Sequence, residues 1–344
     1  MTPTVIPTRL SLRNRTAAMP GIALLAGAIL LAGAAAAAKP EAPPRGAPAG
    51  PVAKADKALR DAFALRTTGR TAVGTFGQAA IVAEQKRRAG VLGELTGTTF
   101  RLTETRHYLI LTDADPAQAA LFAKWCEPLY ANFARLLGMA AALRIWDGKC
   151  MLLLFNTPRE FEDFARRVDG VDAGRWRAYY WMEDFNKEAP ALLHLCFNLK
   201  AGDERTLRNL MAHEGAHAFF SVYQGKTRLP LWLDEGLAEY MAVYDEATLR
   251  PAKLARAAEL AKSTPSLREF FERPAKSVLT TEEYGLVFSL VDCLFETSRP
   301  KFKEFIDALK DGKAQEAALA VAYGFDFTEL EKRWRAWLAA PSPQ

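Results

Sequence analysis

The sequence has few of the residues that build cysteine clusters, histidine clusters and membrane bundles. It contains only four cysteines and four histidines among its 344 residues. The cysteines are widely spaced with no C-x-x-C pair, which excludes a cysteine-ligated zinc site. Two of the histidines fall within one short motif, so no independent site with three histidine ligands can form. After residues 1–38, no apolar run has the length of a membrane span, so no membrane embedding is expected in this part of the chain.

The chain also lacks an excess of charge of either sign once its first segment is set aside. The formal net charge is +5 at pH 7, but three arginines lie in residues 1–38, which hold no acidic residue. The remainder carries 42 basic and 40 acidic groups, a balance that argues against nucleic acid as the main partner. Half of the residues are hydrophobic and a quarter are charged, as in a globular protein with one large domain or two moderate ones.

The first segment has the pattern of a secretory signal peptide. Arg9, Arg13 and Arg15 precede the apolar run Ile22–Ala38, which ends in small alanines suited to cleavage. We therefore expect an exported protein, periplasmic or extracellular. The run is rich in alanine and marginal in length for a span, so an uncleaved leader that anchors the chain is the alternative. No cysteine follows the run and no two of these arginines are adjacent, so neither a lipoprotein nor a twin-arginine signal is indicated.

The cysteines leave two alternatives open. They are Cys126, Cys150, Cys196 and Cys293. Disulfides are permitted in an exported protein, and Cys150 and Cys196 lie in strand-like runs that can be neighbours. Four separate buried thiols are the other interpretation.

The segment after the leader predicts a tether followed by helices. Residues 39–52 are rich in proline, alanine and glycine, which is typical of a flexible linker. Residues 53–105 contain helical patterns around Ala55–Leu65 and Phe76–Val91 and are not placed in a lobe. The second helix carries the charge run Glu84–Arg88, which indicates a solvated helix face.

Residues 106–247, with the strand before them, predict a mixed α/β lobe. The expected strands are Thr98–Thr103, His107–Thr112, Cys150–Phe155, Arg177–Met182 and Ala191–Leu199. The expected helices are Pro116–Leu137, with Asp113 or Asp115 as its cap, and Pro158–Val168.

The motif that carries chemistry is His213–His217, an H-E-x-x-H pattern within a largely apolar helix. Residues four apart share one face of a helix, so His213 and His217 can bind a single metal ion. Glu214 then lies beside the metal, where a carboxylate can accept a proton from water. The apolar neighbours indicate that the helix is buried, and burial of these polar groups without a shared partner is unfavourable.

A second helix supplies the remaining metal ligand. Catalytic zinc takes three protein ligands and leaves one position open. Seventeen residues separate His217 from Glu235, and Gly225 and Pro230 between them let one helix end and another begin. Glu235 is expected to be the third ligand of one Zn²⁺ per chain. Glu239, four residues further, is expected to orient His213.

The segments His213–His217 and Trp232–Tyr240 resemble the gluzincin zinc metallopeptidases, whose third ligand is the glutamate of an Asn-Glu-Gly or Asn-Glu-Ala turn. Asp234 stands where these proteins usually have asparagine. Within that clan the chain is most similar to the peptidase MA-like exported bacterial proteins of a domain-of-unknown-function family. The resemblance covers roughly residues 106–338. It implies an α+β fold of the thermolysin-like zincin type, with a mixed α/β lobe followed by the metal-binding helices and an all-α C-terminal lobe.

The resemblance also implies where substrate and further catalytic groups lie. In gluzincins a strand of the upstream sheet lines the cleft, which makes Ala191–Leu199 the expected strand and His194 a candidate substrate contact. A packed bystander is the alternative for His194. His107, with no acidic neighbour in register, is expected to be structural.

A tyrosine downstream of the glutamate helix stabilises the oxyanion in the resembling families. Tyr284 is the candidate for this role. Tyr240 and Tyr244 are competitors, and a packed tyrosine with a satisfied hydroxyl is the alternative for all three.

Residues 248–340 predict the α-helical C-terminal lobe, and residues 341–344 a loose tail. Its helices are expected at Pro251–Lys262, Ser266–Glu272, Glu282–Thr297, Lys301–Lys310, Ala314–Tyr323 and Phe327–Ala339. Asp326 is expected to cap the last of these, and Trp334 and Trp337 to belong to the core.

Three functions are consistent with these patterns. The first is a zinc-dependent peptidase acting on a peptide or protein outside the cytoplasm, with Glu214 as the base. The second is a hydrolytically silent protein that binds a partner or a cell-envelope component, with a structural zinc. The third is a helix pair without metal, which the glutamates at positions 235 and 239 disfavour. Gly215 is a poor helix residue and is expected to admit another backbone or the substrate.

Overall fold

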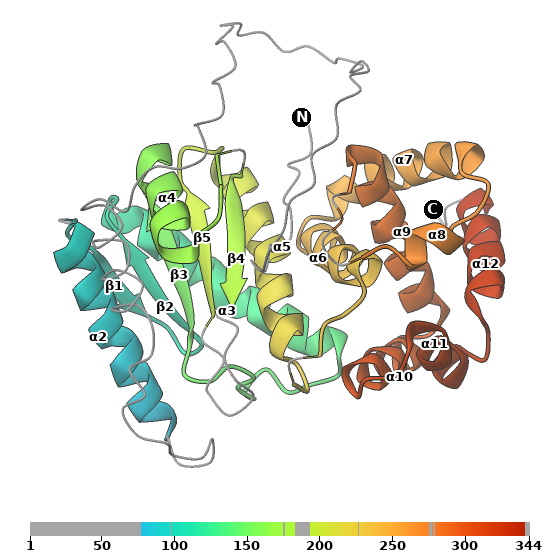
Figure 1. Ribbon diagram of the computed structural model, residues 1–344, viewed down its shortest axis with the longest axis horizontal. Coiled ribbons are helices and arrows are strands. Elements are labelled where there is room, and N and C mark those ends of the chain that lie inside the picture. Colours follow the sequence, from blue (N-terminus) through green and yellow to red (C-terminus); the bar gives the residue numbers. More distant parts are fainter. Residues whose placement is uncertain are drawn as a thin grey trace, which may run out of the picture.

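The N-terminal half of the molecule is a sheet covered by helices on both faces (Figure 1). The computed structural model describes residues 77–96, 98–174, 176–182, 193–225, 227–274, 277 and 279–340. The elements of this half are α2 (Gln78–Thr96), β1 (Arg101–Glu104), β2 (Tyr108–Thr112), α3 (Pro116–Leu136), β3 (Cys150–Phe155), α4 (Pro158–Phe164) with a π-helical turn (Ala165–Asp169), β4 (Ala178–Met182), β5 (Leu193–Asn198) and α5 (Glu204–Val222).

The five strands form one mixed sheet in the order β1-β2-β3-β5-β4. The central strands β2, β3 and β5 are parallel, with Ile110 opposite Leu152 and Leu152 opposite Leu195. Helices bury both faces of these strands, which explains why their sequences are nearly continuous apolar runs. The edge strands β1 and β4 pair antiparallel with β2 and β5.

Side-chain alternation divides this half into two cores. Leu195 and Phe197 of β5 belong to the core shared with α3 and α5. Cys196, between them in sequence, belongs to the core under α2 and α4. The metal-motif helix therefore lies on only one of the two sheet faces.

The C-terminal half is wholly helical among the residues that the structure describes. Its elements are α6 (Leu231–Asp245), a 3₁₀ turn (Ala247–Leu249), α7 (Arg250–Ser263), α8 (Arg268–Phe271), α9 (Thr281–Thr297), α10 (Arg299–Lys310), α11 (Gln315–Tyr323) and α12 (Phe327–Ala339).

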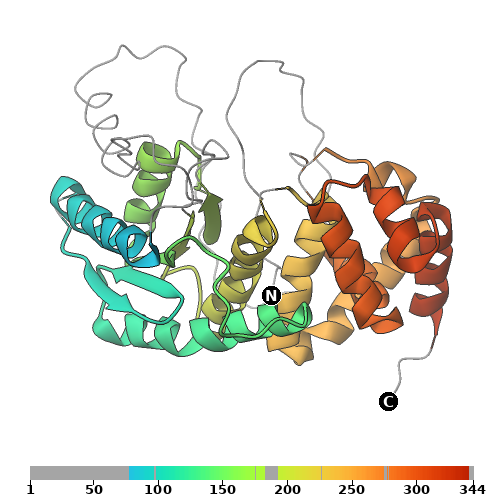
Figure 2. The same ribbon diagram turned by 90° about the horizontal axis from the view of Figure 1, so that it is seen from below.

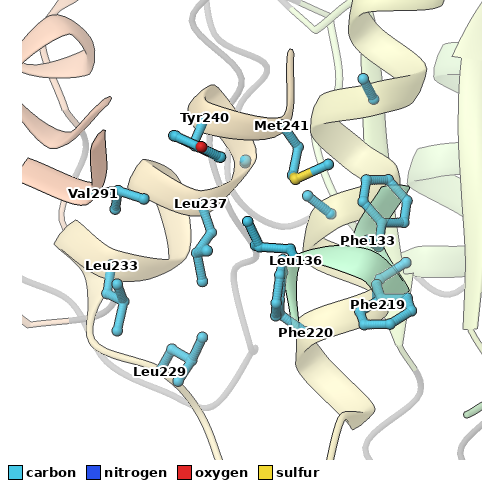
Figure 3. Close-up of a cluster of buried hydrophobic side chains, with 14 of the residues drawn as sticks. Phe133, Leu136, Phe219, Phe220, Leu229, Leu233, Leu237, Tyr240, Met241 and Val291 are labelled. Carbon is cyan, nitrogen blue, oxygen red and sulfur yellow. The ribbon is translucent and has the colours of Figure 1, made fainter. Parts of the chain in front are cut away.

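The two halves share one core, because α5 and α6 lie side by side between the sheet and the other helices (Figures 1 and 2). Helix α3 runs beneath this pair in the view of Figure 2. In the close-up, side chains of α3, α5 and α6 converge, including Phe133, Leu136, Phe220, Leu233 and Leu237 (Figure 3). All five are buried. Packing of this area fixes α5 and α6 relative to each other.

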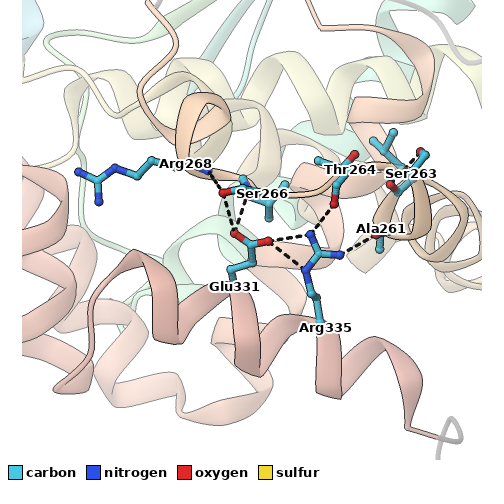
Figure 4. A network of polar contacts seen from close by, with 9 residues as sticks. Ala261, Ser263, Thr264, Ser266, Arg268, Glu331 and Arg335 are labelled. Carbon is cyan, nitrogen blue, oxygen red and sulfur yellow. Dashed lines mark hydrogen bonds and ion pairs between the residues drawn. The ribbon is translucent and has the colours of Figure 1, made fainter.

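A polar network ties the last helix to the segment before α8 (Figure 4). Arg335 of α12 donates to the carbonyl oxygens of Ala261 and Thr264 at 2.6 Å each. Glu331 accepts from the N–H of Leu267 at 2.9 Å and from Arg335 at 2.6 Å. The network satisfies carbonyls at the end of α7 that have no partner within the helix.

Most of the predicted elements are confirmed. Strand β3 spans the predicted residues, and Asp115 caps α3 by accepting from the N–H of Ala117 at 2.8 Å. Asp326 caps α12 in the same way, accepting from Glu329 N–H at 2.8 Å. Trp334 is fully buried in the core, as predicted, and Trp337 packs against it partly buried.

Two predicted helix ends and one predicted helix face differ from the structure. Helix α2 continues to Thr96, and the helix from Pro158 ends at Phe164 before the π-helical turn. The predicted solvated face Glu84–Arg88 is only partly solvated, because Arg88 is 2% exposed and lies against the sheet lobe. Of the two alternatives left open for the cysteines, the structure supports four separate buried thiols. Cys150 and Cys196 point to opposite faces of the sheet, and all four cysteines are free and buried.

The predicted signal peptide, the predicted linker 39–52, the predicted helix around Ala55–Leu65 and the predicted tail 341–344 lie outside the described residues. None of the described helices has the length and apolar character needed to cross a membrane.

The close approach of α6 and α9 generates a testable prediction about Gly236. A Cβ atom at this position would lie 2.7 Å from Val287 O and 2.6 Å from Val291 Cγ2. Gly236→Ala must therefore push α6 from α9, and we expect a loss of ~1–3 kcal/mol in the free energy of unfolding, measured by denaturant titration.

Gly90→Ala is the matched control, since Gly90 is an exposed residue of α2 with nothing within 4 Å of the added Cβ. It is expected to leave stability unchanged or raise it by up to ~1 kcal/mol through helix propensity. A Gly236→Ala variant as stable as this control would contradict the close packing of α6 on α9.

Candidate metal centre

The helix that carries the motif is held at both ends and buried along its second half. Asp203 caps its start by accepting from the N–H of Thr206 at 2.9 Å. At its other end the buried Lys310 of α10 donates to Phe220 O at 2.9 Å and to Ser221 O at 3.2 Å. These contacts satisfy backbone groups that have no partner within the helix and fix α5 along its axis.

Gly215 lets α3 approach α5. A Cβ atom there would lie 3.1 Å from the ring of Phe133. The sequence predicted that another backbone or the substrate would approach Gly215. The structure instead places an aromatic side chain there. The small residue in the motif is thus explained by packing.

Three donor atoms converge between α5 and α6. His213 Nε2 lies 3.2 Å from His217 Nε2, and Glu235 Oε2 lies 3.7 Å from each of them. Tetrahedral ligands ~2.1 Å from zinc lie roughly 3.4 Å from one another, so this spacing fits one ion. All three side chains are almost fully buried. The structure brings together the three residues that the sequence predicted as ligands.

Each histidine has a carboxylate behind it. Glu239 Oε1 lies 3.1 Å from His213 Nδ1, as expected from the sequence. Asp234 Oδ1 lies 3.3 Å from His217 Nδ1, within ion-pair distance but not aligned for a hydrogen bond, so this carboxylate holds its ring less firmly than Glu239 does. A carboxylate on Nδ1 fixes the tautomer that leaves the Nε2 lone pair for a metal.

The charge of the site also favours a cation. Burial by itself would raise the pKa of Glu239, but the charge of Lys253 and the contact with His213 lower this pKa to about 2. Burial would lower the pKa of His217, whereas Asp234 and Glu235 raise it well above its usual value. The raised pKa of His217 shows that carboxylates dominate the field at this ring, which a divalent ion would balance, whereas the lowered pKa of Glu239 reflects the positive charge of Lys253.

Glu214 has the surroundings expected of a base. It is 1% exposed, and its Oε1 has no hydrogen-bond partner among the described residues. The backbone N–H of Tyr180 donates to its carboxylate. Burial raises the pKa of Glu214 to about 7, against the charges of His213 and His217. A buried carboxylate oxygen without a partner is costly, and a water molecule or substrate is the group that would relieve it.

Tyr284 is the tyrosine of the three candidates that lies at the site. It is in the first turn of α9 and 3% exposed. Burial raises the pKa of its hydroxyl, and the charges of Glu235, Glu239 and Glu214 raise it further. Tyr240 instead packs against Phe288 and Phe295.

Tyr244 is the remaining competitor and points away from the site. It is 43% exposed and accepts a hydrogen bond from Arg135 at 3.4 Å. The structure thus separates three tyrosines that the sequence left as alternatives.

The strand predicted to line the cleft was the wrong one. β5 lies between β3 and β4 and pairs with both, so it offers no free backbone edge. β4 is the edge strand on this side of the sheet. Its Tyr180 ring stacks on the ring of His217 with centroids 5.5 Å apart, and its N–H binds Glu214. The sheet edge beside the motif is therefore β4.

His194 is also displaced from its predicted role. Its side chain lies on the sheet face away from α5, where its Nε2 contacts Asp169 Oδ2 at 2.9 Å. Tyr179 donates to the same oxygen at 2.7 Å. Asp169, His194 and Cys196 form a second group of donor atoms close enough together to bind a metal. Asp169 Oδ2 is already shared by two hydrogen bonds, so we interpret the group as a satisfied buried network.

His107 has an acidic partner that the sequence did not indicate. Its Nδ1 lies 2.6 Å from Glu127 Oε2, and its N–H donates to Glu127 Oε1 at 2.8 Å. Glu127 comes from α3, twenty residues away. The role of His107 is structural, as expected, but the reason is this contact.

Three residues at the site were not predicted from the sequence. Asp234 was noted only as a departure from asparagine, and its pairing with His217 was not foreseen. Lys253, which binds Glu239, and Tyr180 carry no motif of their own. Only the packing of α7 and β4 on the metal helices brings them there.

The comparisons with known proteins agree with this geometry. Residues 200–340 match the Peptidase MA superfamily. This Peptidase MA segment contains α5, α6 and the whole helical half, so the resemblance seen in the sequence is confirmed there. The described residues form an α+β arrangement, with a small mixed sheet ahead of the motif helix and the glutamate helix. No curated protein matches the sequence.

Two solved structures are similar over part of their length. They are the crystal structure of an M1 zinc metallopeptidase from Deinococcus radiodurans and that of a mutant of it. Identity is 16% and 15%, the TM-scores are 0.41 and 0.39, and 72% of this chain is covered in both cases. The chain spans about half the length of these structures, 54% and 53%.

The two donor groups generate a prediction about metal content. His217→Ala removes one of the three converging donor atoms between α5 and α6 and is expected to abolish bound zinc in elemental analysis of the purified chain. His194→Gln is the control, expected to keep the zinc content of the wild type. Zinc lost from the control and kept by His217→Ala would show that Asp169, His194 and Cys196 bind the metal instead.

Proposed function

We propose that this chain is a zinc-dependent peptidase that hydrolyses peptide bonds of a peptide or protein outside the cytoplasm. The observation that supports this most directly is Glu214. Its buried carboxylate oxygen without a described partner lies beside three converging ligand atoms. A site that bound metal only for stability would not need this carboxylate.

The donor set suits one zinc ion per chain. His213, His217 and Glu235 would hold it through two ring nitrogens and a carboxylate oxygen, with Glu239 and Asp234 orienting the rings. When bound, zinc polarises the scissile carbonyl and makes a water molecule acidic near neutral pH.

The chain's own groups then move the protons. Glu214 accepts the proton of the attacking water at its free oxygen and delivers it to the nitrogen of the leaving amine. The N–H of Tyr180 holds the carboxylate in place. The hydroxyl of Tyr284 donates a hydrogen bond to the oxygen that becomes negative as the carbonyl is attacked.

The outer edge of β4, which pairs with no other strand among the described residues, supports an extended polypeptide as substrate. A peptide laid along an edge strand gains backbone hydrogen bonds whatever its side chains are. Tyr180 brings this edge next to Glu214. The leader pattern of residues 1–38 supports export.

Glu214→Gln tests the base. The amide has the same shape but cannot take a proton, so we expect unchanged zinc content and a ~10²–10⁴-fold fall in kcat on a cleaved peptide. Zinc by elemental analysis and cleavage of a peptide library are the measurements. A variant that binds zinc and cleaves at the wild-type rate would exclude Glu214 as the base.

The wild type in the same library is the reference. Cleavage that a chelator stops supports the peptidase. A wild type that contains zinc and cleaves nothing would support the hydrolytically silent protein that binds a partner or cell-envelope component.

Tyr284→Phe tests the oxyanion donor. Loss of one such donor is expected to lower kcat by ~10²–10³-fold with little change in KM, measured by steady-state kinetics. Tyr240→Phe, which removes a hydroxyl on the far side of α6, is expected to keep the wild-type kcat. Equal kcat values in these two variants would remove Tyr284 from the mechanism.

A further inference from the structure

Lys253 contacts Glu239, the residue that faces the proposed metal ligand His213. Its Nζ donates to Glu239 Oε2, and Glu239 Oε1 lies 3.1 Å from His213 Nδ1. We propose that Lys253 is a positioning residue that fixes the orientation of His213 through Glu239. The assignment rests on the proposed metal site and concerns how that site is held.

The pair of Lys253 and Glu239 is largely removed from water. The side chains are 18% and 9% exposed. A comparable contact on the surface of α10, between Lys303 and Asp307, has side chains 39% and 26% exposed. Exposed pairs contribute little, because water and salt screen them, whereas a pair out of water holds its geometry more firmly.

The backbone that carries Lys253 is held by a glycine. A Cβ atom at Gly285 would lie 2.9 Å from Lys253 O, so α7 and α9 approach closely at this point. Gly285 follows Tyr284 in the first turn of α9. The same turn therefore sets both the proposed oxyanion donor and the lysine behind His213.

The two carboxylate oxygens of Glu239 have different partners. One binds Lys253 and the other faces His213 Nδ1, so neither oxygen is free to exchange partners. Without the lysine, the carboxylate can rotate about its last bond and leave Nδ1. An imidazole that loses this acceptor loses both its fixed ring orientation and its fixed tautomer, and metal affinity depends on both.

Charge alone predicts the opposite change in zinc affinity when Lys253 is removed, so the two explanations can be distinguished. Lys253 is a cation near the site of another cation, so its removal should strengthen metal binding if charge alone mattered. Weaker binding after its removal is expected only if Lys253 acts by positioning Glu239.

The experiment measures zinc affinity of the purified chain by competition with a chromogenic chelator. Lys253→Met removes the charge and keeps the length of the side chain, and we expect a ~10–100-fold weaker affinity, as for loss of other groups that orient metal-binding histidines. Lys253→Arg keeps a donor for Glu239 and is expected to restore most of the affinity. Lys303→Met is the matched control and should bind zinc as the wild type does.

A second measurement separates positioning from folding. If the role of Lys253 is purely structural, its substitution lowers the Tm of the metal-free and the zinc-loaded chain equally. If Lys253 positions Glu239, its substitution reduces the increase in Tm that zinc binding produces. If Lys253→Met does not fold, Lys253→Gln takes its place, and the same two outcomes decide.

Affinity equal to or tighter than that of the wild type in Lys253→Met would overturn the proposal. This readout does not depend on peptide cleavage, so a wild type that binds zinc without cleaving peptides leaves the role of Lys253 standing. A wild type that binds no zinc overturns both the proposed function and the positioning role.

Discussion

Burial of charge between α5 and α6 is the constraint on which this structure depends. The side chains of Glu214, Glu235 and Glu239 are buried around two nearly inaccessible imidazoles. Such an arrangement is unfavourable without a positive charge among the carboxylates. Lys253 supplies part of it at Glu239, and the three converging donor atoms are suited to a divalent ion for the rest. The chemistry we propose uses the Oε1 atom of Glu214, which has no hydrogen-bond partner among the described residues.

Close helix contacts turn this charge cluster into a defined geometry. Gly215 admits the ring of Phe133, Gly236 lets α6 touch the backbone of α9, and Gly285 brings α7 against α9. Each contact lies next to a residue of the site in sequence. A metal centre tolerates little displacement of its ligands, and short contacts between backbones are stiffer than contacts through long side chains. The helical half therefore serves to hold α6 and Tyr284 against the motif helix.

Patterns in the sequence correctly predicted features that depend on residues close together in the chain. Predictions were wrong for features that depend on contacts between distant segments. The ligands, Glu239 and most helices followed from spacing along one or two helices. Strand β5 was expected at the cleft because it directly precedes α5, but the chain inserts it between β3 and β4. The same strand order carried His194 to the far face of the sheet. His107 was expected to lack an acidic partner, and α3 brings Glu127 to it across twenty residues.

The sequence by itself predicted the donor set of the centre: two histidines four residues apart on one helix, and two glutamates four residues apart on a second helix. Periodicity and spacing suffice for this, because a helix fixes which residues share a face. Only the tertiary structure decided which sheet edge borders the site, which tyrosine reaches it, and that Asp234 and Lys253 support its histidines. These depend on how β4, α7 and α9 pack around α5 and α6, and contacts between segments far apart in sequence leave no periodic signal in the chain.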